Sequence, residues 1–347
     1  MNREINSRQK MIFANLLCIL LIIIALVACG HVQNISSNLF GVIEVGASGI
    51  KGAIVQTSSN KDEMQVINKL EPDNKTPINP DTLKETGDSI NKMFIKIKDN
   101  SVPAENIYIV GSSAVAKAPH REKLKNFVQE KTGKVMDFID VEQEATLIFK
   151  GIVPFNQRGQ VLTIDIGSGN TKGAFIEKTK IENILTFELA WGTKSFAKKV
   201  DEEKGDDNFK KTAGNLRKKI LIPKIKEIAK QKSELKNLSQ VYLSGGIVWA
   251  MTTIMQPDNQ NKLVKITDED INVFYDKLNH NPESLNHGLS KILQVFSINQ
   301  LIAGTEILKT ISDELRFKDK TLFFNKDALH AWSLGYIEEK VKTIKAE

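Results

Sequence analysis

The sequence predicts an α/β protein made of two like-folded domains that face one cleft. Two observations support this: a stretch at 161–176 has a second copy at 39–55, and strands alternate with helices around the copies. In each copy an apolar run ends in an acid, x-Gly and small residues follow, and Lys-Gly-Ala begins a second apolar run. This pattern is typical of strand, tight turn and strand. A repeat about a domain length apart favours two similar domains.

In the first domain, short apolar runs predict strands and helical spacing of apolar residues predicts helices. The expected strands after the first hairpin are 64–70, 106–110 and 134–139. The expected helices are 121–131, 141–151 and one that is capped by 79–81 and runs to about 98, after a loop at 72–80.

The second domain is expected to begin near Gly159 and to continue the alternation. Its expected strands after the second hairpin are 184–189, 241–244 and 321–324. Two of its expected helices begin after 191–195 and after 245–246, and three more cover 208–232, 300–315 and 328–345. Short helices and loops are expected at 256–297. The lysine-rich part of 208–232 is typical of a solvated helix face.

The N-terminus has the features of an export signal. A basic start is followed by an apolar run from 11 to 28, and Leu26-Val27-Ala28-Cys29 ends it. This ending resembles the bacterial lipobox, in which Cys29 becomes the lipidated first residue. The alternative is an uncleaved membrane anchor, because the run is about long enough to span a bilayer. Both interpretations predict an extracytoplasmic, membrane-anchored protein.

We therefore expect a signal peptide at 1–28, a tether at 29–39, a first domain at 40–157 and a second at 158–347. Cleavage would remove Cys18, so Cys29 would be the only cysteine, without a disulfide or a cysteine zinc site. It would also reduce the net charge from +6 to +4, because three basic residues and one acid lie in 1–28. This mild excess suits a polyanionic ligand, and no nucleic-acid partner is expected. A homodimer is left open.

Two acid–glycine turns and a Gly-Gly pair are the candidate ligand sites. Glycines let backbone N–H groups approach a phosphate, and a carboxylate beside them suits hydrated Mg²⁺. Gly245 and Gly246 lie between a strand and a helix, which is a plausible phosphate-facing helix N-terminus. Glu144 lies near a helix N-terminus, where an acid either stabilises the helix dipole or activates water at the edge of the cleft.

Several segments together closely resemble the exopolyphosphatase / guanosine-pentaphosphate phosphohydrolase (Ppx/GppA) family, within the actin/sugar-kinase/Hsp70 superfamily. The segments are 110–115, 121–133, 144–151, 164–171, 189–192 and 303–304. The resemblance covers about 40–337, at the length of the short two-domain form. It implies two ribonuclease-H-like (actin/Hsp70-type) domains with a cleft between them.

The resemblance also implies site residues. The family's catalytic base is the glutamate directly before Ala-x-Leu-Ile, which here is Glu144, and its Mg²⁺-binding aspartate matches Asp165, with Glu44 at the equivalent place in the first turn. Amides of the two turns would hold the terminal phosphates: Gly46, Ala47, Ser48, Gly167, Ser168, Gly169 and Asn170. A glutamate, two amide cradles and a metal can together hydrolyse a phosphoanhydride.

The sequence departs from the family pattern at the site. Glu44 replaces an aspartate, Ala116 replaces a phosphate-binding arginine, and Lys172 replaces an acid. Lys117 follows Ala116 but lacks the bidentate fork of arginine. Ala328–Trp332 replaces the family's Gly-Leu-Arg-Glu-Gly segment.

The leading hypothesis is a Mg²⁺-dependent exopolyphosphatase-like hydrolase that removes terminal phosphate from inorganic polyphosphate outside the cytoplasm. One alternative is a polyphosphate- or phosphate-binding lipoprotein with weak or no turnover. The other is an ecto-apyrase-like nucleoside triphosphatase.

Overall fold

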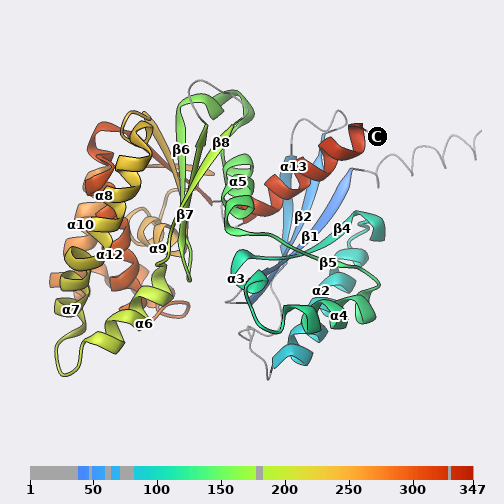
Figure 1. Cartoon of the computed structure of the whole chain (residues 1–347), viewed down its shortest axis with the longest axis horizontal. Coiled ribbons are helices and arrows are strands. Elements are labelled where there is room, and N and C mark those ends of the chain that lie inside the picture. Colours follow the sequence, from blue (N-terminus) through green and yellow to red (C-terminus); the bar gives the residue numbers. More distant parts are fainter. Residues whose placement is uncertain are drawn as a thin grey trace, which may run out of the picture.

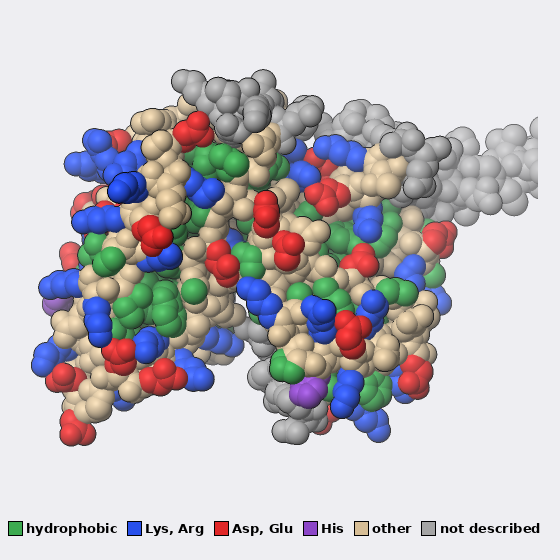
Figure 2. All heavy atoms as spheres, viewed as in Figure 1, with side chains coloured by type: hydrophobic (Ala, Val, Ile, Leu, Met, Phe, Trp, Pro, Cys, Tyr) green, Lys and Arg blue, Asp and Glu red, His purple; other side chains and the backbone are tan. Residues whose placement is uncertain are grey.

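The computed structural model describes residues 38–46, 49–58, 64–70, 82–176, 183–326 and 330–346. They form two mixed sheets with helices around them, and two helices lie between the sheets (Figure 1). Figure 2 shows a hollow in the surface between the lower parts of the two lobes. The predicted α/β fold with two like domains is confirmed.

The first sheet has the order β3-β2-β1-β4-β5. Its strands are β1 (Leu39–Gly46), β2 (Gly49–Thr57), β3 (Met64–Leu70), β4 (Ile107–Gly111) and β5 (Met136–Phe138). Its helices are α2 (Leu83–Asp99), α3 (Ser113–Ala116), α4 (Arg121–Thr132) and α5 (Val141–Ile152).

The second sheet has the order β10-β11-β9-β6-β7-β8. Its strands are β6 (Val161–Ile166), β7 (Thr171–Ile176), β8 (Ile184–Leu189), β9 (Gln240–Gly245), β10 (Leu263–Ile266) and β11 (Thr321–Asn325). Its helices are α6 (Thr193–Glu203), α7 (Phe209–Leu216), α8 (Ile222–Gln231), α9 (Gly246–Met255), α10 (Asp268–His280), α11 (Asn286–Ile292) and α12 (Ile298–Glu314). The chain continues into α13 (Ala331–Ala346).

The two sheets repeat one topology. In each, three antiparallel strands are followed by parallel strands on the side of the first strand, and the second sheet adds β10 at its edge. The two hairpins also share a register: Glu44 lies opposite Lys51, and Asp165 lies opposite Lys172. The internal repeat seen in the sequence is therefore a repeat of structure.

Helices α5 and α13 lie between the sheets and join them (Figure 1). Their apolar side chains share one buried cluster with strand residues of both sheets, such as Val42 and Ala174. The helices cross at backbone contact, because a Cβ on Gly335 would lie 2.0 Å from the Leu147 carbonyl oxygen. A Cβ on Gly151 would lie 1.7 Å from the Ala331 carbonyl oxygen. Only glycine allows so close an approach.

Two polar contacts hold α13 against the rest of the protein. Arg158 holds the Glu338 carboxylate with Nη1–Oε1 and Nη2–Oε2 distances of 2.9 and 2.7 Å. The Tyr336 hydroxyl donates to Asp137, and burial is the largest of the effects that raise the pKa of Tyr336. The expected second domain, 158–347, thus ends in a helix that packs on α5 and also contacts β1, β2 and β3 of the first sheet.

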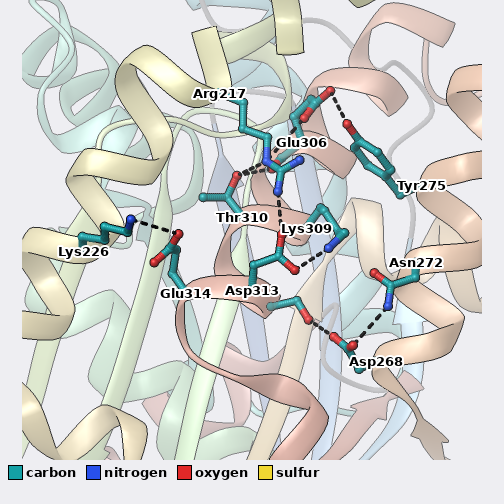
Figure 3. Close-up of polar contacts among 11 residues, drawn as sticks. Arg217, Lys226, Asp268, Asn272, Tyr275, Glu306, Lys309, Thr310, Asp313 and Glu314 are labelled. Atoms are coloured by element: carbon teal, nitrogen blue, oxygen red, sulfur yellow. Dashed lines mark hydrogen bonds and ion pairs between the residues drawn. The ribbon is translucent and has the colours of Figure 1, made fainter. Parts of the chain in front are cut away.

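The helical layer of the second lobe contains a buried polar network (Figure 3). Arg217 begins a π-helical turn, Arg217–Leu221, and binds Asp313 of α12 at 2.6 Å. The Tyr275 hydroxyl donates to Glu306, at 3.2 Å. Burial of Glu306 outweighs the nearby Arg217 and raises the pKa of this carboxyl. This network ties α7, α10 and α12 together.

Local predictions and structure agree for most elements, differ in two places, and are untested at two helix starts that lie outside the described residues. Segment 256–297, expected as short helices and loops, contains the 13-residue α10 and the strand β10. Helix 208–232 is interrupted by the π-helical turn. Helix α2 begins at Leu83 without a side-chain cap, and the predicted cap at 79–81 lies outside the described residues. The terminal helix is described from Ala331, and its predicted start at 328 lies outside the described residues.

The signal peptide at 1–28 and Cys29 lie outside the described residues, as does most of the 29–39 tether. Strand β1 begins at Leu39, one residue before the expected start of the first domain. Within the described part of the chain, we find no helix with the length and hydrophobicity needed to cross a membrane.

Candidate active site

Glu144, Asp165 and Lys172 meet in one buried cluster. Asp165 and Lys172 lie opposite each other on β6 and β7, and Glu144 reaches them from the first turn of α5. The Lys172 ammonium is 2.9 Å from Glu144 Oε1, 3.5 Å from Asp165 Oδ2 and 3.2 Å from Asn170 Oδ1. These three acceptors match the three N–H donors of an ammonium group.

Both oxygens of Glu144 have donors. Oε1 accepts from Lys172, and Oε2 accepts from the backbone N–H of Ser113 at 3.1 Å, at the start of α3. Burial alone would raise the pKa of Glu144, but the Lys172 charge and the two hydrogen bonds outweigh it and lower that pKa. Burial would likewise lower the pKa of Lys172, but Asp165 and Glu144 outweigh it and raise that pKa. The pair is therefore fully charged at neutral pH.

The second glycine turn, Gly167–Asn170, is held by the N-terminus of α6. The N–H groups of Thr193 and Lys194 donate to the carbonyls of Gly167 and Ser168, each at 2.9 Å. No room is left for a side chain at Gly192, since a Cβ there would lie 2.4 Å from the Gly167 carbonyl oxygen.

This docking fixes the direction of the turn's amides. A trans peptide places its C=O and N–H on opposite sides, and the described residues contain no cis peptide. The Ser168 and Gly169 N–H groups therefore point away from α6. The turn also adjoins the charged cluster, since a Cβ on Gly167 would lie 3.6 Å from Asp165 Oδ2 and 3.7 Å from Lys172 Nζ.

The Gly245-Gly246 pair supports this edge of the sheet. Gly245 has a φ of +99°, and a Cβ on it would lie 2.2 Å from the Ile166 carbonyl oxygen. The preceding Ser244 lies opposite Asp165 on β9, and its hydroxyl donates to Asp165 Oδ1 at 2.7 Å. Gly245 thus allows β9 and β6 to approach closely, whereas a Cβ on Gly246 would lie 2.5 Å from the Phe296 ring. The predicted phosphate contact of the pair remains a prediction.

The first glycine turn has a different environment. Ala47 and Ser48 lie outside the described residues, and Gly46 ends β1. The Glu44 carboxylate is only 4% exposed and accepts from the Ser333 hydroxyl of α13. His330 Nδ1 lies 3.5 Å from Glu44 Oε1 and has no hydrogen-bond partner among the residues that the structure describes. Glu44 therefore contacts α13 and its N-terminal flank, and not the charged cluster of the second turn.

Ala116, which stands in place of the family arginine, ends α3, and Lys117 caps this short helix. Arg121 returns to this point, where its Nη1 donates to the Ala116 carbonyl at 2.8 Å. Its Nε also pairs with the exposed Glu122, at 3.2 Å. Arg121 was not predicted to lie at this position.

The geometry does not favour the predicted Mg²⁺ at Asp165 and Glu44. The two acids have separate partners: Ser244 and Lys172 contact Asp165, whereas Ser333 and His330 lie against Glu44. The described residues contain no group of three or more His, Cys, Asp and Glu side chains that could hold a metal. The place between Asp165 and Glu144 is taken by the Lys172 ammonium. Mg²⁺ binding stays a prediction that these side chains do not fit.

The structure thus brings together Glu144, Asp165 and the turn Gly167–Asn170, and leaves Glu44 apart. Sequence reasoning missed two partners, Ser244 and the Ser113 amide. Ser244 had a signal, because it directly precedes Gly-Gly at the end of a strand. Lys172 was noted only as a departure from the family and not as the centre of the site.

Comparisons with known proteins agree with this geometry. The family model described as "Ppx/GppA phosphatase family" matches residues 47–323. A guanosine-5'-triphosphate,3'-diphosphate pyrophosphatase of Vibrio cholerae is 23% identical over 249 residues, which are 68% of this chain and 47% of that one. Retrograde regulation protein 2 of Saccharomyces cerevisiae is 22% identical over 158 residues, 42% of this chain and 27% of that one. The chain spans about half the length of the Vibrio relative, or less for the yeast one.

Solved structures show the same fold. An exopolyphosphatase from Cytophaga hutchinsonii superposes with a TM-score of 0.64 at 17% identity, over 87% of this chain and 98% of that one. A Ppx/GppA family member from Aquifex aeolicus gives a TM-score of 0.63 at 16% identity, over 88% and 98% of the two chains. With its family match, its repeated topology and its glutamate beside the second glycine turn, the chain belongs to the Ppx/GppA phosphatase family.

Proposed function

We propose that this chain is a phosphoanhydride hydrolase of the exopolyphosphatase type, which removes the terminal phosphate from inorganic polyphosphate. The observation that carries the proposal is the meeting of Glu144, Asp165 and Lys172 beside the turn Gly167–Asn170. Membership of the Ppx/GppA family supports phosphoanhydride chemistry.

The described groups suit the charge of the substrate. A terminal phosphate beside the turn would meet the Ser168 and Gly169 amides, which are aimed away from α6. Consecutive backbone N–H groups make an anion-binding concavity, and the Lys172 ammonium offsets part of the negative charge of the Glu144 and Asp165 carboxylates beside it. Phosphoryl transfer depends mainly on positioning and on stabilising charge.

In the proposed reaction, a water oxygen attacks the terminal phosphorus and the P–O bond to the bridging oxygen breaks. The products are orthophosphate and a chain shorter by one phosphate. Glu144 would position the water and accept its proton, and the leaving oxygen would take the electron pair. A carboxylate whose pKa is lowered is a weak base, so we expect slow turnover.

A second candidate is a phosphoanhydride-binding protein without turnover, and one observation favours it. Both Glu144 oxygens already accept hydrogen bonds, from Lys172 at 2.9 Å and Ser113 at 3.1 Å. Each oxygen can still accept a second hydrogen bond from water, but the ammonium and the amide stabilise the ionised form of Glu144 and so weaken it as a base.

The test is phosphate release from a panel of polyphosphate, a nucleoside triphosphate and guanosine pentaphosphate, with wild type and Glu144→Gln. The hydrolase proposal expects release from polyphosphate by wild type and its loss in Glu144→Gln. Equal near-zero rates with retained polyphosphate binding support the binding protein. Much faster cleavage of the nucleoside triphosphate than of polyphosphate contradicts the polyphosphate assignment and supports the apyrase-like alternative.

We further propose that the protein acts outside the cytoplasm, anchored by lipid on Cys29. This rests on the signal-like sequence of 1–28. Labelling with a fatty-acid probe should mark the wild type and not Cys29→Ser. Unchanged labelling of Cys29→Ser would show that Cys29 is not the lipid site.

A further inference from the structure

Lys172 fills a cation site made of the chain's own oxygens. Its ammonium lies within 3.5 Å of oxygens from Glu144, Asp165 and Asn170. The Lys172 side chain is only 4% exposed, and those of Glu144 and Asp165 are 8% and 16% exposed. A cluster of two carboxylates and one amide oxygen is the donor set that a divalent cation would otherwise use.

The position of Lys172 in the fold keeps its ammonium there. Lys172 is in the middle of the β6–β8 ladder, paired with Asp165 on one side and Glu188 on the other. Its two strand neighbours, Thr171 and Gly173, are buried. Moving the ammonium into solvent would leave two buried carboxylates unpaired, which is strongly unfavourable.

A metal ion and this ammonium exclude each other at the cluster. Mg²⁺ binds oxygens at about 2.0–2.1 Å in near-octahedral geometry. To reach Asp165 Oδ2 and Glu144 Oε1 together it would need the space that Lys172 Nζ occupies. The other Asp165 oxygen and the other Glu144 oxygen already accept from Ser244 and Ser113.

We propose that Lys172 is a resident cation that takes the place of a divalent metal, so that this chain binds its phosphoanhydride without Mg²⁺. The inference rests on the proposed function for the identity of the ligand, but the claim that no metal binds the cluster can be tested alone. Lys172 also replaces the acid of the family pattern, so one substitution removes a negative charge and adds a positive one.

The experiment uses the mature full-length chain, with Mn²⁺ as the probe of metal binding and polyphosphate as the ligand. Electron paramagnetic resonance measures Mn²⁺ bound to the free protein, and calorimetry measures polyphosphate binding in Mg²⁺ and in EDTA. The variant is Lys172→Gln. The matched control is Lys51→Gln, which changes the lysine at the same register of the first hairpin. Circular dichroism confirms that each variant is folded.

We expect no stoichiometric Mn²⁺ binding to wild type or Lys51→Gln, and one bound Mn²⁺ per chain for Lys172→Gln. EDTA should not weaken the binding of polyphosphate to wild type but should weaken it about tenfold or more in Lys172→Gln, since the variant then depends on the metal. One tightly bound Mn²⁺ on wild type, lost in Asp165→Asn, would overturn the proposal. So would a tenfold loss of wild-type polyphosphate affinity in EDTA.

Two further outcomes still test the proposal. If Lys172→Gln does not fold, the two wild-type measurements still decide the question. If wild type binds no polyphosphate in either condition, the proposed function fails. The Mn²⁺ measurement then still tests whether Lys172 takes the place of a metal ion.

Discussion

The two acid–glycine hairpins share sequence, topology and register, yet their acids have different partners. In the first hairpin, Glu44 accepts from Ser333 and lies beside His330, and no ion pair of Lys51 is found within the described residues. In the second, Asp165 and Lys172 join Glu144 in a buried charged cluster. The difference comes from the helix that meets each hairpin: the α13 region meets the first and the start of α5 meets the second. An inherited repeat thus carries two different sites.

The largest expected effect on stability comes from replacing the lysines that lie at equivalent positions of the two hairpins. Lys172→Met should reduce the free energy of unfolding by about 3–5 kcal/mol, because it leaves two buried carboxylates without their cation. Lys51→Met should change it by less than about 0.5 kcal/mol. Urea unfolding measures both variants. Equal losses would contradict the asymmetry between the hairpins.

The hydroxyl donors to the two acids provide the next comparison. Ser333→Ala should cost about 1.5–3 kcal/mol, because it removes a hydrogen bond to a buried carboxylate for which the described residues supply no ammonium partner. Ser244→Ala should cost about 1 kcal/mol, because Lys172 still compensates Asp165. Thermal unfolding of the two variants ranks them, and the reverse order would disprove this explanation.

The docking of α6 on the second turn gives a smaller effect. Gly192→Ala should cost about 1–3 kcal/mol, because its Cβ would collide with the turn backbone. Gly159→Ala is the control, since a Cβ there meets no atom within 4 Å. Calorimetric unfolding should show a lower melting temperature for Gly192→Ala alone. A melting temperature unchanged from wild type would mean that the turn adapts.

The smallest effect is the pH dependence of the cluster. The folded pKa of Glu144 is lowered from 4.5, so its stabilising contribution is present above pH 4.5 and is lost as pH falls through the folded pKa. The folded pKa of Lys172 is raised from 10.5, so its contribution is present below pH 10.5 and is lost as pH rises through the folded pKa.

In a plot of the free energy of unfolding against pH, Glu144→Gln should therefore reduce the slope at acid pH. The reduction is at most about 1.4 kcal/mol per pH unit, the value for one proton. Glu44→Gln is the comparison from the first hairpin. Urea unfolding from pH 3 to 7 measures both. If Glu144→Gln loses as much stability at acid pH as wild type does, ionisation of Glu144 is not a cause of that loss.

Much of the fold was predictable because its signals are local. The strand periods at 39–55 and 161–176 and the glycines between them reveal the two hairpins without any tertiary information. The structure places Glu144 and Asp165 beside the second turn, and the roles of these residues remain predictions.

The rest could not be predicted because it depends on packing between distant segments. The pairing of Lys172 with Glu144 depends on how α5 lies across β7, and the sequence around either residue does not encode that angle. Likewise, the sequence predicts a helix at 328–345 but not its place between two sheets. The π-helical turn at Arg217–Leu221 has no local signal that we recognised.

The placement of α13 has a consequence for synthesis of the protein. The core between the sheets joins Phe40 near one end of the chain with Val341 near the other. The strands of both sheets therefore emerge from the ribosome before the helix that completes this core. Contacts of such long sequence separation form late and slowly. During this interval, the apolar face of α5 that α13 will cover is open to chaperones, or to α13 of a second chain.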